Sequence, residues 1–253
     1  MATTLSQTAA LGLQFQPQEP RAAVTTLRVA LATGTDAQAA DISELQAAFA
    51  LRSYTVTTQT TAAMAQGTME ANTVVAVVGA ALNDTTLRDK LNGAGRPVVL
   101  FWSNLDGATY APGTTIGGLL GVIANEQSVN SGGSTNPLTI ATGYRAARIT
   151  SGFFPGTTVQ IYDNTADDIS VLPNARTHFA GTALLNEATT GRACMLAVER
   201  GDSKIAAITG TFTERVVWAP CIHPELGLTG QGSLLANLCI EWAAGNYHSR
   251  EFV

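Results

Sequence analysis

Residues 73–102 read TVVAVVGAALNDTTLRDKLNGAGRPVVLFW, and this stretch decides the fold class. It begins with the β-branched run Thr73–Val78, which is typical of a strand buried on both faces. Asn83-Asp84 can then cap a helix, and the glycines that follow can end it. Pro97–Trp102 is a second apolar run. Strand, helix and strand in this order predict a right-handed crossover between parallel strands.

The residues before this stretch continue the same rhythm. Leu27–Ala32 is a short apolar run that ends at the polar segment 33–36. Ile42, Leu45 and Phe49 then recur at helical spacing, and Asp41 is available as a cap. Tyr54–Thr58 alternates as a strand does. The whole stretch therefore predicts a β-α-β-α-β unit with a parallel sheet.

The residues after this stretch are less regular until the last helix. A helix at Thr115–Ala124 is weakened by three glycines. The clearest helix begins at Thr229 or Ser233, carries an apolar stripe over Leu234–Trp242 and ends at Gly245. The predicted strands are Val159–Tyr162, His178–Leu185, Ala193–Glu199, Lys204–Thr209 and Arg215–Ala219, with a hairpin turn at Gly201-Asp202.

The chain is predicted to have three parts. Residues 1–26 contain Pro17 and Pro20 and no sustained period, so they form an extended arm. Residues 27–245 form one α/β domain, and residues 246–253 form a tail. The predicted architecture is a three-layer, flavodoxin-like sandwich around a mainly parallel sheet. A domain of this length buries a large core.

Composition excludes several classes of partner. Charged residues make up 13% of the chain, about half the usual share, and the net charge is −5. The only lysines are Lys90 and Lys204, and no basic cluster exists for nucleic acid. No apolar run is long enough for a membrane span, and Met1–Ala10 lacks the features of a secretory signal. We therefore expect a protein that is cytoplasmic as synthesised.

The sharpest local motif is Cys221-Ile222-His223-Pro224-Glu225. It follows a predicted strand and precedes the last helix, where open α/β sheets place their sites. His223 and Glu225 are therefore candidate catalytic residues, in which the carboxylate orients a general base. The plainer alternative is a strand-to-helix loop that turns the chain. Cys221, His223 and Glu225 could share a face as metal ligands, but Pro224 interrupts them, so we expect no metal and no cofactor.

The end of the domain resembles a known family. Arg215–Gly245 is similar to the end of class I glutamine amidotransferase-like domains, in which a strand leads to His-Pro-Glu and a closing helix. The run Trp242–Gly245 also resembles the end of the closing helix in ThuA-like members of this family. The resemblance covers roughly residues 27–245 and implies a flavodoxin-like sheet.

The resemblance also implies a nucleophile, and here the chain departs from the family. The enzymes carry Gly-x-Cys-x-Gly on a tight elbow after the fourth strand. The corresponding stretch, Pro97–Gly107, has no cysteine, and Phe101 and Trp102 stand where small residues are needed. Ser103 is the only candidate nucleophile there, and it lacks the elbow that forms an oxyanion hole. We therefore expect no glutaminase activity.

A small ligand has other candidate contacts near the predicted strand ends. These are Thr33 and Asp36 after the first strand, and Trp102 and Asn104 after the fourth. Trp218 and Tyr110 could line the same cleft of a small-molecule or carbohydrate site. His178 is expected to be structural. Asp163 with Asp167-Asp168 reads as a solvated acidic loop, since calcium requires more regularly spaced oxygens.

The sequence favours a structural or assembly role, and a component of a phage or virus particle is one candidate for it. The arm carries Leu11, Leu13 and Phe15, which alternate and can point one way from an extended chain. We expect this segment to join copies of the chain into a homo-oligomer or larger assembly by adding to a sheet edge. The alternatives are a hydrolase or amidase using His223 and Glu225, and a small-molecule or carbohydrate-binding domain.

Overall fold

The computed structural model describes residues 27–64, 70, 73–102, 109–110, 113–142, 150, 153–163, 167–174, 178–205 and 207–245. Several sequence predictions lie outside these residues. They concern the arm with Leu11, Leu13 and Phe15, the elbow residues Ser103 and Asn104, and the tail after residue 245.

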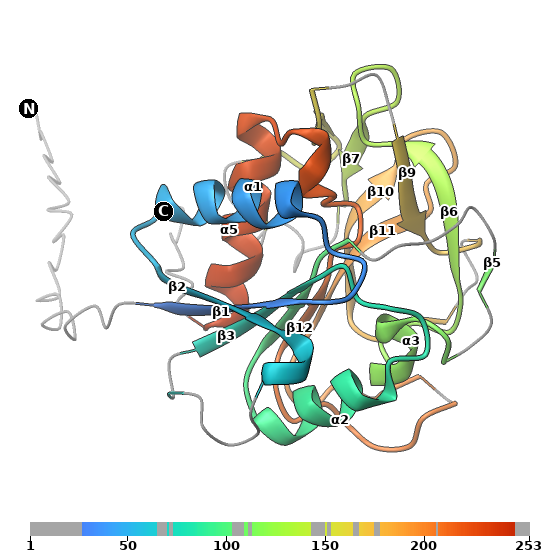
Figure 1. Ribbon diagram of the computed structural model, residues 1–253. Helices are drawn as coiled ribbons and strands as arrows, with labels where there is room; N and C mark the ends of the chain where they lie inside the picture. Colours follow the sequence, from blue (N-terminus) through green and yellow to red (C-terminus); the bar gives the residue numbers. More distant parts are fainter. Residues whose placement is uncertain are drawn as a thin grey trace, which may run out of the picture.

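The described chain is built around one nine-stranded sheet, in the order β2-β1-β3-β4-β12-β11-β10-β7-β8 (Figure 1). The first five strands in this order run parallel. The predicted parallel arrangement is therefore confirmed, and the α/β class with it. The parallel strands are β1 (Arg28–Thr33), β2 (Thr55–Thr60), β3 (Thr73–Val78), β4 (Val98–Leu100) and β12 (Val216–Trp218).

Four antiparallel strands extend this sheet beyond β12. The predicted strand at Lys204–Thr209 is wrong for its described residues. The chain there folds back on itself, because the amide of Lys204 donates to the Gly210 carbonyl and that of Ile205 to the Gly121 carbonyl. The antiparallel strands are β7 (Leu138–Ile140), β8 (Thr158–Val159), β10 (Thr182–Glu187) and β11 (Ala193–Val198).

A second, three-stranded sheet was not predicted from the sequence. It consists of β5 (Thr109–Tyr110), β6 (Glu126–Ser131) and β9 (Asp167–Val171), in the order β5-β6-β9. Asp167 and Asp168 thus begin a strand, so the expected acidic loop is wrong at these two positions. The reason is the apolar alternation that follows them, since Ile169 and Val171 are both buried. This small sheet lies beside β10 and β11 (Figure 1).

Helices cover both faces of the central sheet, as predicted (Figure 1). The predicted caps are present, since the side chains of Asp84 and Thr229 accept amides at the starts of α2 and α5. The predicted helix at 115–124 is shorter, because Gly121 turns left-handed after one turn. The helices are α1 (Ala39–Ala50) and α5 (Gly230–Ala243) on one face, α2 (Thr85–Ala94) and α3 (Ile116–Leu120) on the other, and the 3-10 turns η1 (Thr61–Ala63) and η2 (Pro224–Leu226).

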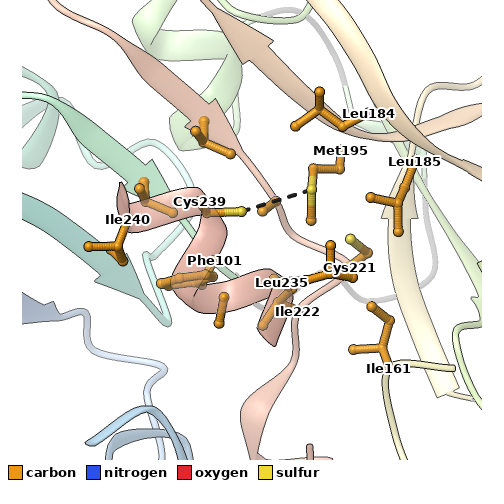
Figure 2. Packing of buried hydrophobic residues seen from close by; sticks show 14 of the residues in the cluster. Phe101, Ile161, Leu184, Leu185, Met195, Cys221, Ile222, Leu235, Cys239 and Ile240 are labelled. Carbon is orange, nitrogen blue, oxygen red and sulfur yellow. Dashed lines mark hydrogen bonds between the residues drawn. The ribbon is translucent and has the colours of Figure 1, made fainter. Parts of the chain in front are cut away.

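The three thiols lie in the core between α5 and the sheet. Cys194, Cys221 and Cys239 are free and buried, as predicted for Cys194 and Cys239. Figure 2 shows Cys239 directed at Met195, with the two sulfur atoms 3.9 Å apart. Burial raises the pKa of the Cys221 and Cys239 thiols, which therefore remain protonated. These cysteines contribute packing rather than reactivity.

Candidate functional site

The best-defined polar cluster lies at the carboxyl ends of the parallel strands. Backbone hydrogen bonds hold the loops there together, since the Trp102 amide donates to the Ile222 carbonyl at 3.1 Å. The Gly79 amide in turn donates to the Trp102 carbonyl at 2.8 Å. The loops after β3, β4 and β12 therefore form one surface. This is the edge where open α/β sheets place their ligand sites.

His223 and Glu225 lie side by side in the loop between β12 and α5. The His223 Nε2 atom is 3.4 Å from Glu225 Oε1, and the two side chains are 7% and 22% exposed. Pro224 begins η2 directly after His223 and tightens the chain between them. The contact that the sequence predicted between His223 and Glu225 is therefore present in the structure. A carboxylate at this distance can orient an imidazole.

Trp102 packs against the same histidine. Its ring stacks on the His223 imidazole, with centroids 4.0 Å apart and an angle of 4° between the planes. The stack covers one face of the imidazole and fixes the plane of the ring. The nitrogen atoms lie on the edge of the ring and are not covered by the stack. Two residues predicted for different roles, a ligand contact and a catalytic base, therefore meet in one cluster.

Asp41 completes the cluster, and sequence reasoning missed it. It lies in the first turn of α1 and is fully buried. Its Oδ2 atom accepts the Gln38 amide at 3.0 Å, and its Oδ1 atom accepts the Glu225 amide at 3.1 Å. Burial raises the pKa of this carboxyl, and the two backbone hydrogen bonds partly oppose that shift. Asp41 thus caps its own helix and anchors the His223 loop.

The three side chains converge on one point. One ligand-type atom from each of Asp41, His223 and Glu225 lies within 4.8 Å of the other two. Two carboxylates and an imidazole in this arrangement can hold a proton between them or coordinate a cation. Only the Asp41 partner could not be expected from local sequence, because it precedes Glu225 by 184 residues.

Cys221 does not belong to this cluster. Its side chain lies in the hydrophobic core beneath the loop, together with Ile161 and Leu185 (Figure 2). The hydroxyl of Tyr162 donates to the Cys221 carbonyl and holds the backbone there. The hypothetical ligand set of Cys221, His223 and Glu225 is therefore wrong, because the turn at Pro224 breaks the strand-like alternation that it required.

The loop after β1 uses its amides within the protein. The Gly34 amide donates to the Val78 carbonyl at 2.8 Å and the Asp36 amide to the Gly79 carbonyl at 3.1 Å. The Thr33 hydroxyl donates to the Gln59 carbonyl at 3.3 Å. A ligand role for Thr33 and Asp36 stays a prediction, and their loop offers few unsatisfied backbone donors for it.

Trp218 does not line a cleft at the strand ends. It is 1% exposed, and its indole donates a hydrogen bond to the carboxyl group of Glu126 on β6. Glu126 also accepts from Thr115 and Ser170, yet burial raises its pKa to about 7. Its Oε2 atom has no hydrogen-bond partner among the described residues. The expected small-molecule site therefore loses Trp218, and Glu126 instead joins the small sheet to the central one.

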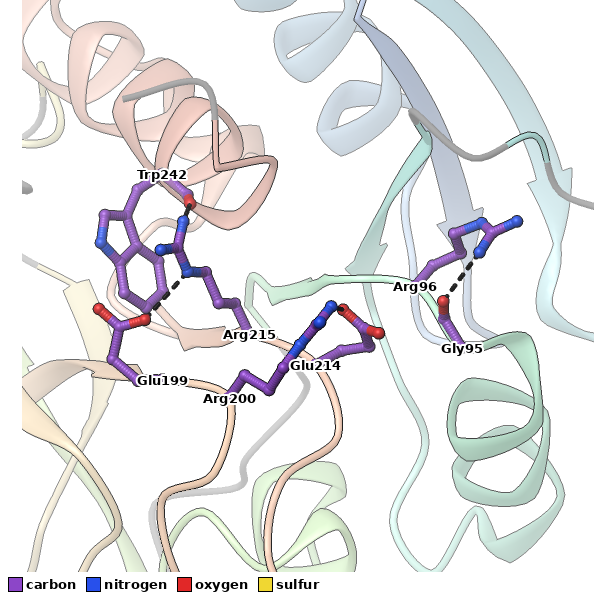
Figure 3. Close-up of polar contacts among 7 residues, drawn as sticks. All are labelled: Gly95, Arg96, Glu199, Arg200, Glu214, Arg215 and Trp242. Atoms are coloured by element: carbon purple, nitrogen blue, oxygen red, sulfur yellow. Dashed lines mark hydrogen bonds and ion pairs between the residues drawn. The ribbon is translucent and has the colours of Figure 1, made fainter. Parts of the chain in front are cut away.

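A cavity of about 260 Å³ lies at the opposite end of the sheet, beside the first residues of β4 and β12. Charged groups on its wall are engaged locally, as Arg96 donates to the Gly95 carbonyl and Arg200 pairs with Glu214 at 2.7 Å (Figure 3). Nearby, Arg215 lies between Glu199 and Trp242 (Figure 3). This mixed lining shows no convergence of like groups on one point.

Comparison with solved structures supports the same architecture. A ThuA-like protein from Bacteroides uniformis superimposes with a TM-score of 0.54 at 12% identity, over 89% of this chain and 95% of that one. A chain of PurLQS from Thermotoga maritima superimposes with a TM-score of 0.51 at 9% identity, over 86% of this chain and 99% of that one. No family model matches the chain, and no curated protein matches it either.

These likenesses concern the fold. The α/β sheet architecture expected from the resemblance at His223-Pro224-Glu225 and the closing helix is confirmed at the level of the fold. Identities of 9% and 12% carry no activity across. Among the described residues, no helix is long and apolar enough to cross a membrane.

Proposed function

We propose that this chain is a non-catalytic assembly protein on an amidotransferase-like fold, and that copies of it join by strand addition at β2. The observation that carries this proposal is the open edge of the central sheet. Within the described part of the chain, β2 pairs with β1 on one side and with no strand on the other. Such an edge is a template for another chain.

The chemistry of β2 suits a partner strand. Its sequence, TVTTQT, has no charge and no proline, the usual devices that block edge pairing. The Thr55 amide donates to the Leu27 carbonyl on the β1 side. Because backbone groups alternate along a parallel ladder, those of Val56, Thr58 and Thr60 point to the outer side. A six-residue edge of this kind can accept one extended segment.

Exposed apolar side chains lie next to β2, together with an ion pair, Arg52 with Glu241 at 3.5 Å. Exposed alanines on α1, among them Ala47 and Ala50, lead to Leu51, which is 76% exposed just before β2. The other end of the same sheet differs, because its edge strand β8 has only two residues. A docked segment with apolar side chains would therefore find contacts at β2 and little room at β8.

The occupant that we propose is the arm of a neighbouring copy. Leu11, Leu13 and Phe15 alternate, so in an extended segment they would lie on one face. Each contributes about 1.5–3 kcal/mol if fully buried, and strand addition satisfies the backbone. The segment 17–26 can extend roughly 33 Å, which exceeds the spacing of several strands.

The polar cluster agrees with a non-catalytic role. Both carboxylate oxygens of Asp41 accept backbone amides, so this residue fixes the loop that carries Glu225. Trp102 occupies one face of His223. These contacts give the loop a structural purpose, and a reacting group is not needed to explain it.

The test is the particle size of matched variants, measured by size-exclusion chromatography with light scattering. Deleting residues 2–20 should leave a folded monomer that no longer assembles. Thr58→Pro removes an outward amide but no β1 bond, and should raise the dissociation constant of the assembly at least about tenfold. Thr158→Lys, on the other edge strand, is the control. The proposal fails if the deletion and Thr58→Pro retain the full-length particle.

A hydrolase is the second candidate, favoured by the 3.4 Å contact between His223 Nε2 and Glu225 Oε1. Its nucleophile would be Ser103, which lies outside the described residues. Release of ammonia from glutamine or an amide by the purified chain, abolished in both His223→Ala and Ser103→Ala, would establish this activity. The assembly proposal expects no such release.

A further inference from the structure

We propose that Asp41, His223 and Glu225 together bind one divalent transition-metal ion, with Zn²⁺ the best match to their chemistry. The inference goes beyond the assembly proposal and does not depend on it. It also departs from the expectation that the sequence alone supports, since Asp41 enters the site only through the fold.

The geometry requires little adjustment. The three ligand atoms lie within 4.8 Å of one another, and the pair His223 Nε2 and Glu225 Oε1 is 3.4 Å apart. Ligand atoms about 2.1 Å from one ion are separated by at most about 4.2 Å. The 3.4 Å pair already fits a tetrahedral site, and bringing a 4.8 Å separation to the same value requires about 1.4 Å of side-chain movement.

The ligand atoms retain the capacity to coordinate. Each carboxylate oxygen of Asp41 accepts one backbone amide, and a carboxylate oxygen carries two lone pairs. These amides orient the carboxylate as an outer shell of hydrogen bonds orients a metal ligand. The Trp102 stack similarly fixes the plane of the His223 ring.

The burial of the carboxylates in the cluster favours the binding of a cation. Asp41 is fully buried, His223 is 6% exposed, and both lie beside the partly exposed Glu225. Buried carboxylates are costly unless hydrogen bonds or a cation compensate their charge. One divalent ion would balance two carboxylates around a neutral imidazole.

The donor set selects the class of ion. One imidazole nitrogen with two carboxylate oxygens suits Zn²⁺ and its first-row neighbours, whereas Ca²⁺ and Mg²⁺ prefer oxygen ligands alone. A bound ion would connect the first turn of α1 to η2, two segments that the Asp41–Glu225 hydrogen bond already joins. Its first consequence would be a more stable loop between β12 and α5.

Isothermal titration of the EDTA-treated full-length chain with ZnCl₂ tests the site. The expected result is one ion per chain. Asp41→Asn, His223→Ala and Glu225→Gln should each weaken binding at least about 100-fold, since even outer-shell changes cost 10–100-fold. His178→Ala and Glu214→Gln, which alter residues away from the cluster, are the matched controls and should bind as the parent chain does.

A spectroscopic readout locates the ion independently. Co²⁺ in place of Zn²⁺ should quench the fluorescence of Trp102, which stacks on His223. Trp102→Phe keeps an aromatic ring and should bind Zn²⁺, but should lose most of this quenching. Circular dichroism confirms that each variant is folded, and Glu225→Gln, at the most exposed ligand, is the least disruptive.

Two results would overturn the proposal. The first is the absence of stoichiometric Zn²⁺ binding to the folded parent chain at micromolar concentration. The second is binding that His223→Ala and Glu225→Gln retain at full affinity, which would mark an adventitious ion elsewhere. Neither result depends on particle size, so the metal site and the assembly proposal can fail separately.

Discussion

Glu126 should make the stability of this protein depend on pH. It lies on β6, is 1% exposed, and accepts hydrogen bonds from Thr115, Trp218 and Ser170. Burial raises its pKa from an ordinary value of 4.5 to about 7. Between these values the folded chain holds a proton that the unfolded chain has lost. The free energy of unfolding must therefore fall as pH rises through this window.

The size of the effect follows from the shift. At about 1.4 kcal/mol for each pH unit, a rise from 4.5 to about 7 corresponds to about 3 kcal/mol. The stabilisation is fully present below about pH 4.5 and is lost above about pH 7. Glu126→Gln imitates the protonated carboxyl and should remove this dependence. It should match the parent chain in acid and exceed its stability by up to about 3 kcal/mol at about pH 8.

Urea denaturation at several pH values from about 5 to 8 measures this difference directly. Glu44→Gln, at a partly exposed position on α1, is the matched control and should follow the parent chain. Comparing variants removes the contribution of all other titrating groups. Parallel pH profiles for Glu126→Gln and the parent chain would refute the reasoning, because they would mean that Glu126 titrates alike in both states.

Three further substitutions test how the loops and helices are held, each by thermal or urea denaturation. Gly34→Ala should destabilise by at least about 2–3 kcal/mol, because the added Cβ would lie 1.9 Å from the Gly79 carbonyl oxygen; Gly230→Ala, with open space around it, should be neutral or slightly stabilising. Asn237→Ala should cost about 1–3 kcal/mol, since its amide joins α5 to the Ala48 carbonyl at 2.9 Å; an unchanged midpoint would show that water replaces this bond. Cys239→Ala should cost only packing energy, about 1 kcal/mol, and leave assembly intact; a changed particle size would contradict the inert role of the thiol.

The parallel half of the fold could be predicted from the sequence because its signals are local. Thr73–Val78 and Pro97–Trp102 are apolar runs, and α2 between them is bounded by the cap Asp84 and the left-handed Gly95. Burial on both faces demands such runs. The small sheet was hard to predict, because β6 is almost entirely polar and β9 has only two apolar positions, Ile169 and Val171, too short an alternation to identify a strand without its pairing.

The site was half predictable for a similar reason. His223 and Glu225 are close in sequence, and a turn between them brings their side chains together. Asp41 is locally a candidate helix cap, and in the structure it occupies the N3 position of a capping box whose N-cap is Gln38. Nothing in the neighbouring sequence indicates a second role. Cys221 lies apart from the site because alternation holds only in a strand, and the chain turns at Pro224, as the sequence already indicated.

Amide hydrogen exchange at β2 tests the assembly proposal most directly. The amides of Val56 and Thr58 face the outer edge, so in a lone domain they should exchange rapidly. The account predicts that both are protected in the assembled full-length chain and exchange rapidly once residues 2–20 are deleted. Equal exchange in the two proteins, whether fast or slow, would contradict it, because the arm of a neighbour would then not cover this edge.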